Sequence, residues 1–250
     1  MERLTILGSA SAVPDEHHEN THLMVSAGSH TVLVDCGSNP IQHLRRAGVS
    51  FESLTDIVLT HFHPDHVSGL PLLLMGMWLM GRKAPIKIYG IAHTLERAEA
   101  MMDLFEWKNW PGFYPVAFIQ VENKERAPVI VGKEIRLYAS PVQHLIPTIG
   151  LRIEFPCAGK TIAYSSDTEP CLSVASLAKG VDILIHEAAG ASPGHSSPAQ
   201  AAEIGNRASA KDLYLIHYPP EKNTQELVQE AQKVFIGQVL LAHDFMEINF

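Results

Sequence analysis

The stretch Ile57-Val58-Leu59-Thr60-His61-Phe62-His63-Pro64-Asp65-His66 sets a short apolar run directly before three histidines and an aspartate. The apolar run predicts a buried strand, so the polar side chains lie on the loop that leaves it. Imidazole nitrogens and carboxylate oxygens are zinc ligands, and the chain has no closely spaced cysteine pair to replace them. Such a loop can direct His61 and His63 at one ion, and Asp65 and His66 at a second ion. The stretch therefore predicts a metal site.

Composition describes an ordinary globular protein. The chain has 250 residues, 46% of them hydrophobic and 18% charged, and it suits a single α/β domain over residues 1–250. The apolar segment 70–80 is shorter than the roughly 20 residues that a bilayer requires, so we expect a buried helix and no membrane partner. We find no signal peptide, and three widely spaced cysteines favour a reducing, cytoplasmic location.

Charge argues modestly against a long polyanionic substrate. The net charge is −8, from 27 acidic and 19 basic residues, and no basic run is present that would bind a nucleic-acid backbone.

The wider pattern of the chain predicts two sheets packed together with helices outside, a four-layer αββα sandwich of the α/β class. Ser197-Pro198-Ala199-Gln200 is a capping box, and Asn223 opens a further helix that we expect to end at Gly237. Strands are predicted at 4–7, 22–26, 31–34, 56–59, 86–89, 116–121, 135–139, 149–154, 161–164, 181–185 and 213–216. Further helices are predicted at 40–47, 67–80 and 95–107.

The stretch 59–71 resembles the first metal motif of the metallo-β-lactamase superfamily, and in particular that of the ribonuclease Z branch. Further segments resemble the same branch along the whole chain. They are Gly8-Ser9-Ala10-Ser11-Ala12-Val13-Pro14, Asn20-Thr21, Asp35-Cys36-Gly37, His186-Glu187, Gly194-His195-Ser196-Ser197 and Asp244-Phe245-Met246-Glu247-Ile248.

This resemblance implies three more metal ligands, each after an apolar strand. His144 fits the third histidine on the first zinc, Asp167 the aspartate that bridges both ions, and His217 the remaining histidine on the second zinc. Two Zn²⁺ ions, for which Mn²⁺ or Fe²⁺ could substitute, would lie about 3.5–4 Å apart and bridge a hydroxide made at neutral pH.

The resemblance also suggests catalytic roles. Asp65 would bind metal and orient the hydroxide, His195 would donate a proton to the leaving group, and Glu187 would orient His195. Asp35 is either a hydrogen-bond partner of a ligand histidine or a turn residue. His186 is expected to be a packing residue or a hydrogen-bond partner of a ligand rather than a ligand itself.

One family feature is absent. Transfer-RNA-processing relatives commonly carry a long Gly/Pro-rich arm between the third histidine and the bridging aspartate, whereas the interval from His144 to Asp167 holds only two strands and a turn. We therefore expect a ribonuclease Z-like phosphodiesterase that acts on a small or short phosphodiester, with RNA not favoured. The alternatives are a lactonase or other ester hydrolase, and a tRNA 3′-end processing endoribonuclease. The family implies a homodimer.

The remaining candidates receive less specific interpretations. We expect surface positions for His17, His18, His22, His30, His43 and His93, with His17 and His18 able to reach the mouth of the site. Core or dimer-face positions are expected for Met75, Met77, Trp78 and Met80. The aromatic stretch 107–118 is either a lip over the site or simple packing.

Overall fold

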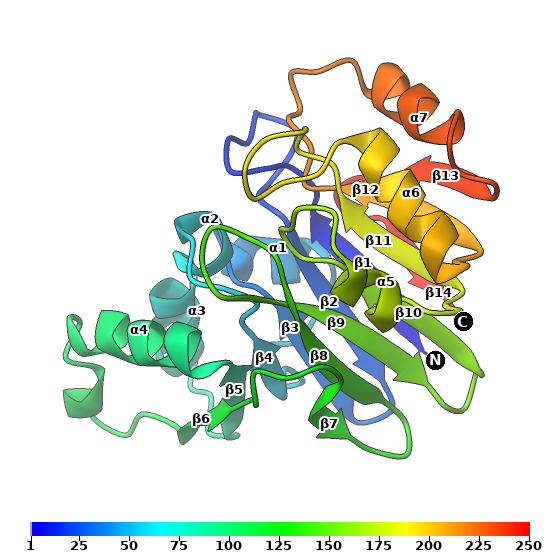
Figure 1. Ribbon diagram of the computed structural model, residues 1–250. Coiled ribbons are helices and arrows are strands. Elements are labelled where there is room, and N and C mark those ends of the chain that lie inside the picture. Colours follow the sequence, from blue (N-terminus) through cyan, green and yellow to red (C-terminus); the bar gives the residue numbers. More distant parts are fainter. Residues whose placement is uncertain (1) are drawn as a thin grey trace.

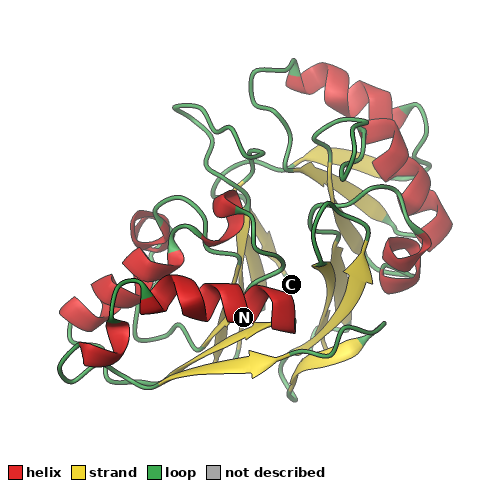
Figure 2. Ribbon diagram, turned by 60° about the vertical axis from the view of Figure 1, so that its left-hand side comes forward, coloured by secondary structure: helices red, strands yellow, loops and turns green. Residues whose placement is uncertain are grey.

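The computed structural model describes residues 2–250, in which two seven-stranded sheets pack face to face (Figures 1 and 2). The first sheet contains, in spatial order, β14 (Glu247–Asn249), β1 (Arg3–Gly8), β2 (His22–Ala27), β3 (His30–Val34), β4 (Asp56–Val58), β5 (Ile86–Gly90) and β6 (Val116–Gln120). The second contains β13 (Gln238–Leu241), β12 (Asp212–Ile216), β11 (Ile183–Glu187), β10 (Lys160–Tyr164), β9 (Thr148–Phe155), β8 (Arg136–Val142) and β7 (Ala127–Val131).

Helices cover both outer faces, as Figure 2 shows. The first sheet carries α1 (Pro40–Arg46), α2 (Pro64–Val67), α3 (Leu70–Leu79), α4 (Ala92–Asp103) and the 3-10 turn η1 (Trp107–Asn109). The second carries α5 (Leu172–Leu177), α6 (Pro198–Ala208) and α7 (Thr224–Gln232).

Three apolar clusters hold the layers together. The largest lies between the sheets, where Val58 of the first sheet and Ile185 of the second are fully buried. A second cluster joins the first sheet to its helices through residues such as Leu74, and a third joins the second sheet to α6 and α7 through residues such as Ala201. Each fully buried leucine or isoleucine contributes about 1.5–3 kcal/mol. The four-layer αββα sandwich that the sequence predicts is therefore confirmed.

The predicted helix at 67–80 corresponds to α3, and its predicted start is wrong, because Val67 belongs to the separate short helix α2. α2 ends at Val67 and α3 begins at Leu70. Gly69 lies between them in close contact with the loop after β3: a Cβ there would lie 2.6 Å from Cδ of Pro40 and 2.9 Å from the carbonyl oxygen of Cys36. The break separates the short helix that carries Asp65 and His66 from the helix that packs on the sheet.

The strands that the sequence pattern missed are the outermost ones. β14 ends the first sheet, and β13 and β7 are the two ends of the second. Edge strands are short and half exposed, so their apolar pattern is weak, and Pro128 inside β7 is tolerated because an edge strand need not donate every N–H. The short helix α5 was also missed, and α7 ends at Gln232 rather than at Gly237.

Parallel pairing determines where the site forms. β3, β4 and β5 run parallel, and so do β10, β11 and β12. Their carboxyl ends lie at one edge of the sandwich, where the loops of both sheets meet.

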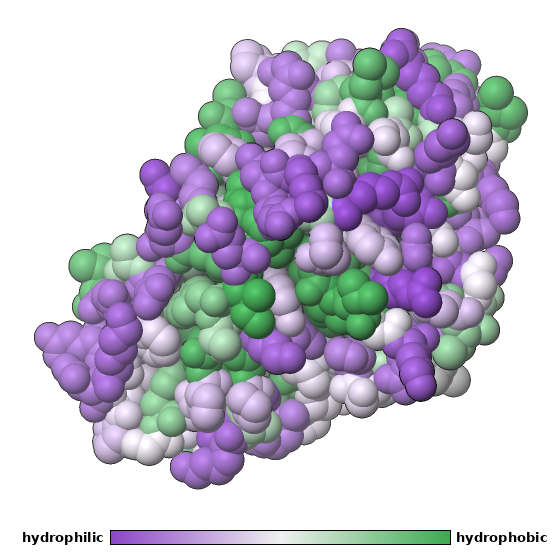
Figure 3. All heavy atoms as spheres, turned by 60° about the horizontal axis from the view of Figure 1, so that its bottom comes forward, coloured by the Kyte–Doolittle hydropathy of each residue, from purple (hydrophilic) through white to green (hydrophobic). Residues whose placement is uncertain are grey.

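Among the described residues no helix is long and apolar enough to cross a membrane. On the face that Figure 3 displays, hydrophilic side chains surround separate hydrophobic patches.

Candidate metal centre

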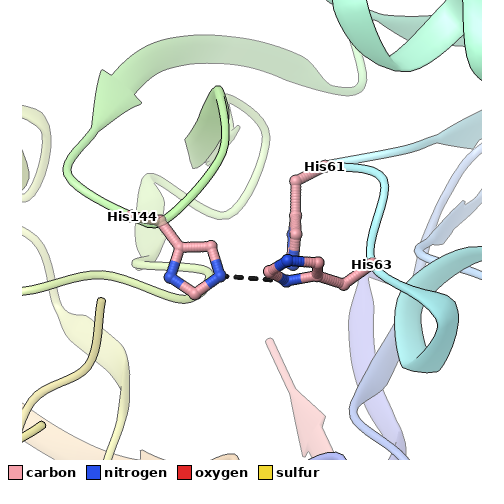
Figure 4. Close-up of side chains that lie close together, drawn as sticks. All are labelled: His61, His63 and His144. Carbon is pink, nitrogen blue, oxygen red and sulfur yellow. Dashed lines mark hydrogen bonds between the residues drawn. The ribbon is translucent and has the colours of Figure 1, made fainter. Parts of the chain in front are cut away.

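The structure brings His61, His63 and His144 together (Figure 4). His61 and His63 follow β4, and His144 follows β8 of the opposite sheet, so the three rings converge from the two halves of the sandwich. The Nε2 atom of His144 lies 3.1 Å from Nδ1 of His63. Three imidazoles at this spacing could hold one metal ion.

A second group contains Asp65, His66, Asp167 and His217, whose ligand atoms all lie within 4.8 Å of one another. One oxygen of Asp167 lies 3.4 Å from Nε2 of His217 and 3.5 Å from Nε2 of His66. The same oxygen lies 3.9 Å from Nε2 of both His61 and His144. Asp167 therefore lies between the two groups, where a bridging ligand would be needed.

The loops around this centre contain unusual backbone conformations. Asp35, Ser166 and His217 have φ angles of 63°, 54° and 53°, although none is a glycine. A left-handed conformation costs a non-glycine residue about 1–3 kcal/mol, and such residues cluster at functional sites. The surrounding packing stabilises these strained conformations next to Asp167 and at His217, whose side chains belong to the second group.

Atoms without partners show that these residues fit metal ions. His61 Nε2, His66 Nε2 and Asp167 Oδ1 are buried and have no hydrogen-bond partner among the described residues. Leaving such atoms unpaired costs about 1–3 kcal/mol each. All three belong to the two groups, and nitrogen and oxygen donors in this number suit a pair of divalent cations.

Asp35 determines which nitrogen of two histidines faces the centre. His66 donates from Nδ1 to Asp35 over 2.8 Å. Thr60 donates its hydroxyl hydrogen to the same carboxylate, so its oxygen is left to accept from Nδ1 of His61 at 3.0 Å. Both rings therefore present a bare Nε2 to the centre.

Electrostatics stabilise this arrangement. Burial by itself would raise the pKa of Asp65, but the hydrogen bond with His217 and the nearby imidazole of His66 hold it below its usual range. Burial would likewise raise the pKa of Asp167, and the positive charges that His217 and His66 can carry outweigh it, so this pKa is lowered. Both carboxylates are charged at neutral pH, as metal ligands must be.

Glu187 and His195 form a pair beside the second group. Glu187 is fully buried at the end of β11 and accepts hydrogen bonds from His195 Nδ1 at 3.0 Å and from the backbone N–H groups of Thr168, Ala189 and Ser196. The bond to Glu187 raises the pKa of His195. At neutral pH His195 can therefore carry a proton on Nε2, the nitrogen that faces away from Glu187.

A pocket of about 230 Å³ opens onto these groups. Its walls include site residues that the sequence predicts, from both sheets, together with small and apolar residues that were not predicted to belong to the site. These additions are Ser11, Ala12, Val13, Ala189 and Pro219. Ser11, Ala12 and Val13 belong to a segment quoted above for its family resemblance, and that was the one signal that pointed to them.

Several histidines lie elsewhere. His17 and His18 do not line this pocket, and His186 is buried outside the metal groups. The predicted surface positions of His22 and His43 are wrong, because both side chains are buried. They hydrogen-bond each other over 2.9 Å, and this pairing allows two polar rings to enter the interior.

The aromatic stretch 107–118 packs against its own members and against α3 rather than over the metal centre. Trp78 and Trp110 stack with ring centres 5.2 Å apart, and Phe113 meets Trp107 edge-on. Trp110 and Met75 line a separate apolar pocket. The packing interpretation is therefore the correct one.

Comparison with known proteins agrees with this geometry. The family model described as anti-Pycsar protein Apyc1 matches residues 2–240. The chain is 30% identical to a ribonuclease Z of Mycobacterium sp. (strain KMS), over all of this chain and 96% of that one. The crystal structure of the metallo-β-lactamase fold protein YhfI from Bacillus subtilis has a TM-score of 0.83 and 23% identity, and covers 99% of this chain and 98% of its own.

The crystal structure of human tRNase Z, short form, has a TM-score of 0.78 and 25% identity, and covers 99% of this chain and 98% of its own. The shared fold, the full coverage and the family match lead to one assignment: the chain belongs to the anti-Pycsar protein Apyc1 family and is a ribonuclease Z-like member of the metallo-β-lactamase superfamily.

Proposed function

We propose that this metal-dependent hydrolase of the phosphodiesterase type uses two Zn²⁺ ions to cleave a small or short phosphodiester, and that residues 1–250 act as one hydrolase domain. One observation carries the proposal. Seven histidine and aspartate residues form two adjoining groups that could hold metal ions, and a buried carboxylate–imidazole pair lies beside the second of them. A phosphodiester needs this combination, because charge on the phosphoryl oxygens and on the leaving oxygen must both be stabilised.

The proposed ligands divide between two ions. His61, His63 and His144 would hold the first, with Asp167 between it and the second. Asp65, His66 and His217 would complete the second. When bound, the pair of ions supplies Lewis-acid stabilisation of phosphoryl oxygens and lowers the pKa of coordinated water.

The chain's own residues would perform the proton transfers. Asp65 lies at the pocket wall and accepts a hydrogen bond from His217, so it can orient the attacking water. His195 also lines the pocket and would give its Nε2 proton to the leaving oxygen. Glu187 would fix the ring and stabilise its positive charge, since it accepts from Nδ1.

Pocket size and lining support a small substrate over RNA. The pocket measures about 230 Å³, and no lysine or arginine lines it. Between His144 and Asp167 the chain forms only β9, β10 and a turn, which leaves no arm to grip a tRNA. The alignment with the Mycobacterium ribonuclease Z extends over 276 positions, more than the 250 residues of this chain, as expected if that relative carries additional segments.

We propose a homodimer and a cytoplasmic location. The helix α3 and the segment that follows α4 expose apolar side chains: Leu72 and Phe105 line the apolar pocket, and Leu104 precedes Phe105 in the chain. A second copy of the chain would cover them, and light scattering of the purified protein tests this. Three free cysteines, with Cys157 exposed, suit a reducing compartment.

The decisive experiment measures hydrolysis of bis-p-nitrophenyl phosphate by metal-analysed protein, beside an acyl-homoserine lactone and a precursor tRNA. We expect turnover of the phosphodiester that is lost with chelator and in Asp65→Ala. Rapid lactone opening without phosphodiester turnover would assign an ester hydrolase instead. Cleavage of the precursor tRNA at its 3′ end would instead assign the chain as a tRNA 3′-end processing endoribonuclease.

The family description adds a role to test. We propose that the chain counteracts Pycsar, as the family's name says of its namesake. Co-expression of a Pycsar system with wild-type protein and with Asp65→Ala would separate this role from the mere presence of the fold.

A further inference from the structure

Glu169 lies two residues after the proposed bridging ligand, at the point where two loops of the second sheet meet. One carboxylate oxygen accepts from the side-chain amide of Gln143 at 2.6 Å, and the other accepts from the backbone N–H of Gly194 at 2.8 Å. Gln143 immediately precedes the proposed ligand His144, and Gly194 immediately precedes the proposed proton donor His195. One side chain thus joins the segment that carries a ligand to the segment that carries the acid.

The peptide groups of Gly194 complete the connection. Its carbonyl oxygen lies 2.7 Å from Nδ1 of His144, and because a carbonyl can only accept, that nitrogen must carry the hydrogen. Nε2 of His144 is therefore bare and directed toward His63. The orientation of this proposed ligand depends on where Gly194 lies.

Gly194 is held where no other residue fits. Its φ angle is +84°, and a Cβ would lie 2.8 Å from Cγ of Leu145 and 2.9 Å from Nδ1 of His144. A loop in this conformation needs an anchor, because glycine has more conformational freedom to lose than any other residue. The anchor of its N–H group is Glu169.

We propose that Glu169 is a positioning residue that sets the distance between the metal centre and the proton donor, by fixing Gly194 and through it both His144 and His195. This inference rests on the proposed function. Glu169 does not line the pocket, so it acts through its neighbours rather than on the substrate.

Removal of this carboxylate should leave the fold intact. The backbone N–H of Glu169 donates to the carbonyl of Gln143 over 2.7 Å, and Ser196 donates its hydroxyl hydrogen to the carbonyl of Thr168 over 2.7 Å. Both bonds survive in Glu169→Ala, so the loops stay together while Gly194 loses its anchor.

Glu169→Gln provides the conservative comparison. Its amide oxygen can still accept from Gly194, and its amide NH₂ can donate to Gln143 once the side-chain amide of Gln143 turns over. Geometry is then kept while the charge is removed. Glu203→Ala is a matched control, because Glu203 is exposed on α6 and makes no side-chain hydrogen bond or ion pair within residues 2–250.

The experiment measures kcat and KM on two diesters, bis-p-nitrophenyl phosphate and diphenyl phosphate, together with zinc affinity by chelator competition. Phenolate is the more basic leaving group, so its departure depends more on the proton from His195. In Glu169→Ala we expect zinc affinity, and kcat on diphenyl phosphate, to fall by roughly 10–100-fold, with a smaller loss on the nitrophenyl diester and unchanged KM. Glu169→Gln should recover most of both losses.

Two results would overturn the proposal. One is wild-type zinc affinity and wild-type kcat on both diesters in Glu169→Ala. The other is an equal loss on both diesters that Glu169→Gln does not restore, since a general structural defect gives that pattern. If wild type and Glu203→Ala cleave neither diester, the proposed function fails on its own. Zinc affinity and the Nδ1–H signal of His144 in NMR spectra then decide, and unchanged values in Glu169→Ala would refute the positioning role.

Discussion

The two sheets supply the proposed metal centre in different ways. The first sheet contributes four ligands, His61, His63, Asp65 and His66, from a single segment after β4. The second contributes His144, Asp167 and His217, each from the end of a different strand. A contiguous group depends on local backbone conformation, whereas a dispersed group depends on the register of a whole sheet. The first should therefore tolerate distant changes better than the second.

The two sheets also differ in how their ligands are oriented. Asp35 serves both His61 and His66, directly or through Thr60, from the neighbouring strand end. In the second sheet orientation comes from two carboxylates, Glu169 and Glu187, that bind loop backbone as well as side chains. We therefore expect the acid and a ligand of the second sheet to be coupled through loop backbone, whereas Asp35 connects only ligands of the first sheet to each other.

The largest expected effect separates the two carboxylate ligands. Asp167 lies within 3.9 Å of four histidine nitrogens, from both groups, while Asp65 lies within 3.4 Å of two, those of His66 and His217 in the second group. We expect Asp167→Ala to lose both metal ions and Asp65→Ala to lose one, as measured by metal analysis after gel filtration. Each should lower kcat by about 10³-fold or more, since metal stabilisation of the transition state amounts to several kcal/mol.

The control for this pair is Asp15→Ala, which removes an exposed carboxylate from the loop before the site. Equal metal contents in Asp65→Ala and Asp167→Ala would contradict the bridging position of Asp167.

The next effect concerns the proton donor. His195→Ala should lower kcat by about 10²–10⁴-fold for a basic leaving group and much less for p-nitrophenolate. The bond to Glu187 raises the pKa of His195. In Glu187→Gln we therefore expect the rate on the basic side of the pH–rate profile, measured with diphenyl phosphate, to fall at a lower pH than in the wild type. A profile that is unchanged in both variants would assign the acid to another group.

The sequence predicts the first sheet's contribution well, because ligands and strand are adjacent in the chain. His144, Asp167 and His217 came only from family resemblance, since a lone histidine or aspartate after a strand carries little information. The positioning role of Glu169 toward Gly194 could not be found this way, because it arises from a contact between segments 25 residues apart. The pair His22 and His43 was misjudged for the same reason: burial of a polar ring depends on a partner 21 residues away.

A smaller effect is expected at Asp35, which orients two ligands of the first sheet. Asp35→Asn keeps the size of the side chain but weakens the bond to Nδ1 of His66. We expect zinc affinity to fall by roughly 10–100-fold. Chelator competition measures it, with Asp56→Asn, a carboxylate that touches His30, as the control. A loss no larger than that of the control would show that Asp35 does not orient these two ligands.

The smallest effect compares two buried histidines that are not ligands, one in each sheet. Burial lowers the pKa of His22 in β2 to about 3 and that of His186 in β11 to about 4. An unfolded histidine has a pKa of about 6.5, so between pH 6 and 5 the unfolded chain binds protons that the folded chain does not. The free energy of unfolding of the metal-free protein should therefore decrease as the pH is lowered from 6 to 5. Each histidine should contribute up to about 1.4 kcal/mol per pH unit.

Urea unfolding at pH 7, 6 and 5 of His22→Gln and His186→Gln should show shallower falls than wild type, while His17→Gln, altered at an exposed ring, should match it. If this prediction fails, the explanation differs between the two histidines. A wild-type slope in His22→Gln would mean that the His22–His43 pair holds a proton in the folded state. Glu19 would be its counter-ion, 3.2 Å from Nε2 of His43. Within residues 2–250 the ring of His186 bonds only to the backbone carbonyl of Glu187, so a wild-type slope there would mean that its ring is hydrated rather than dry.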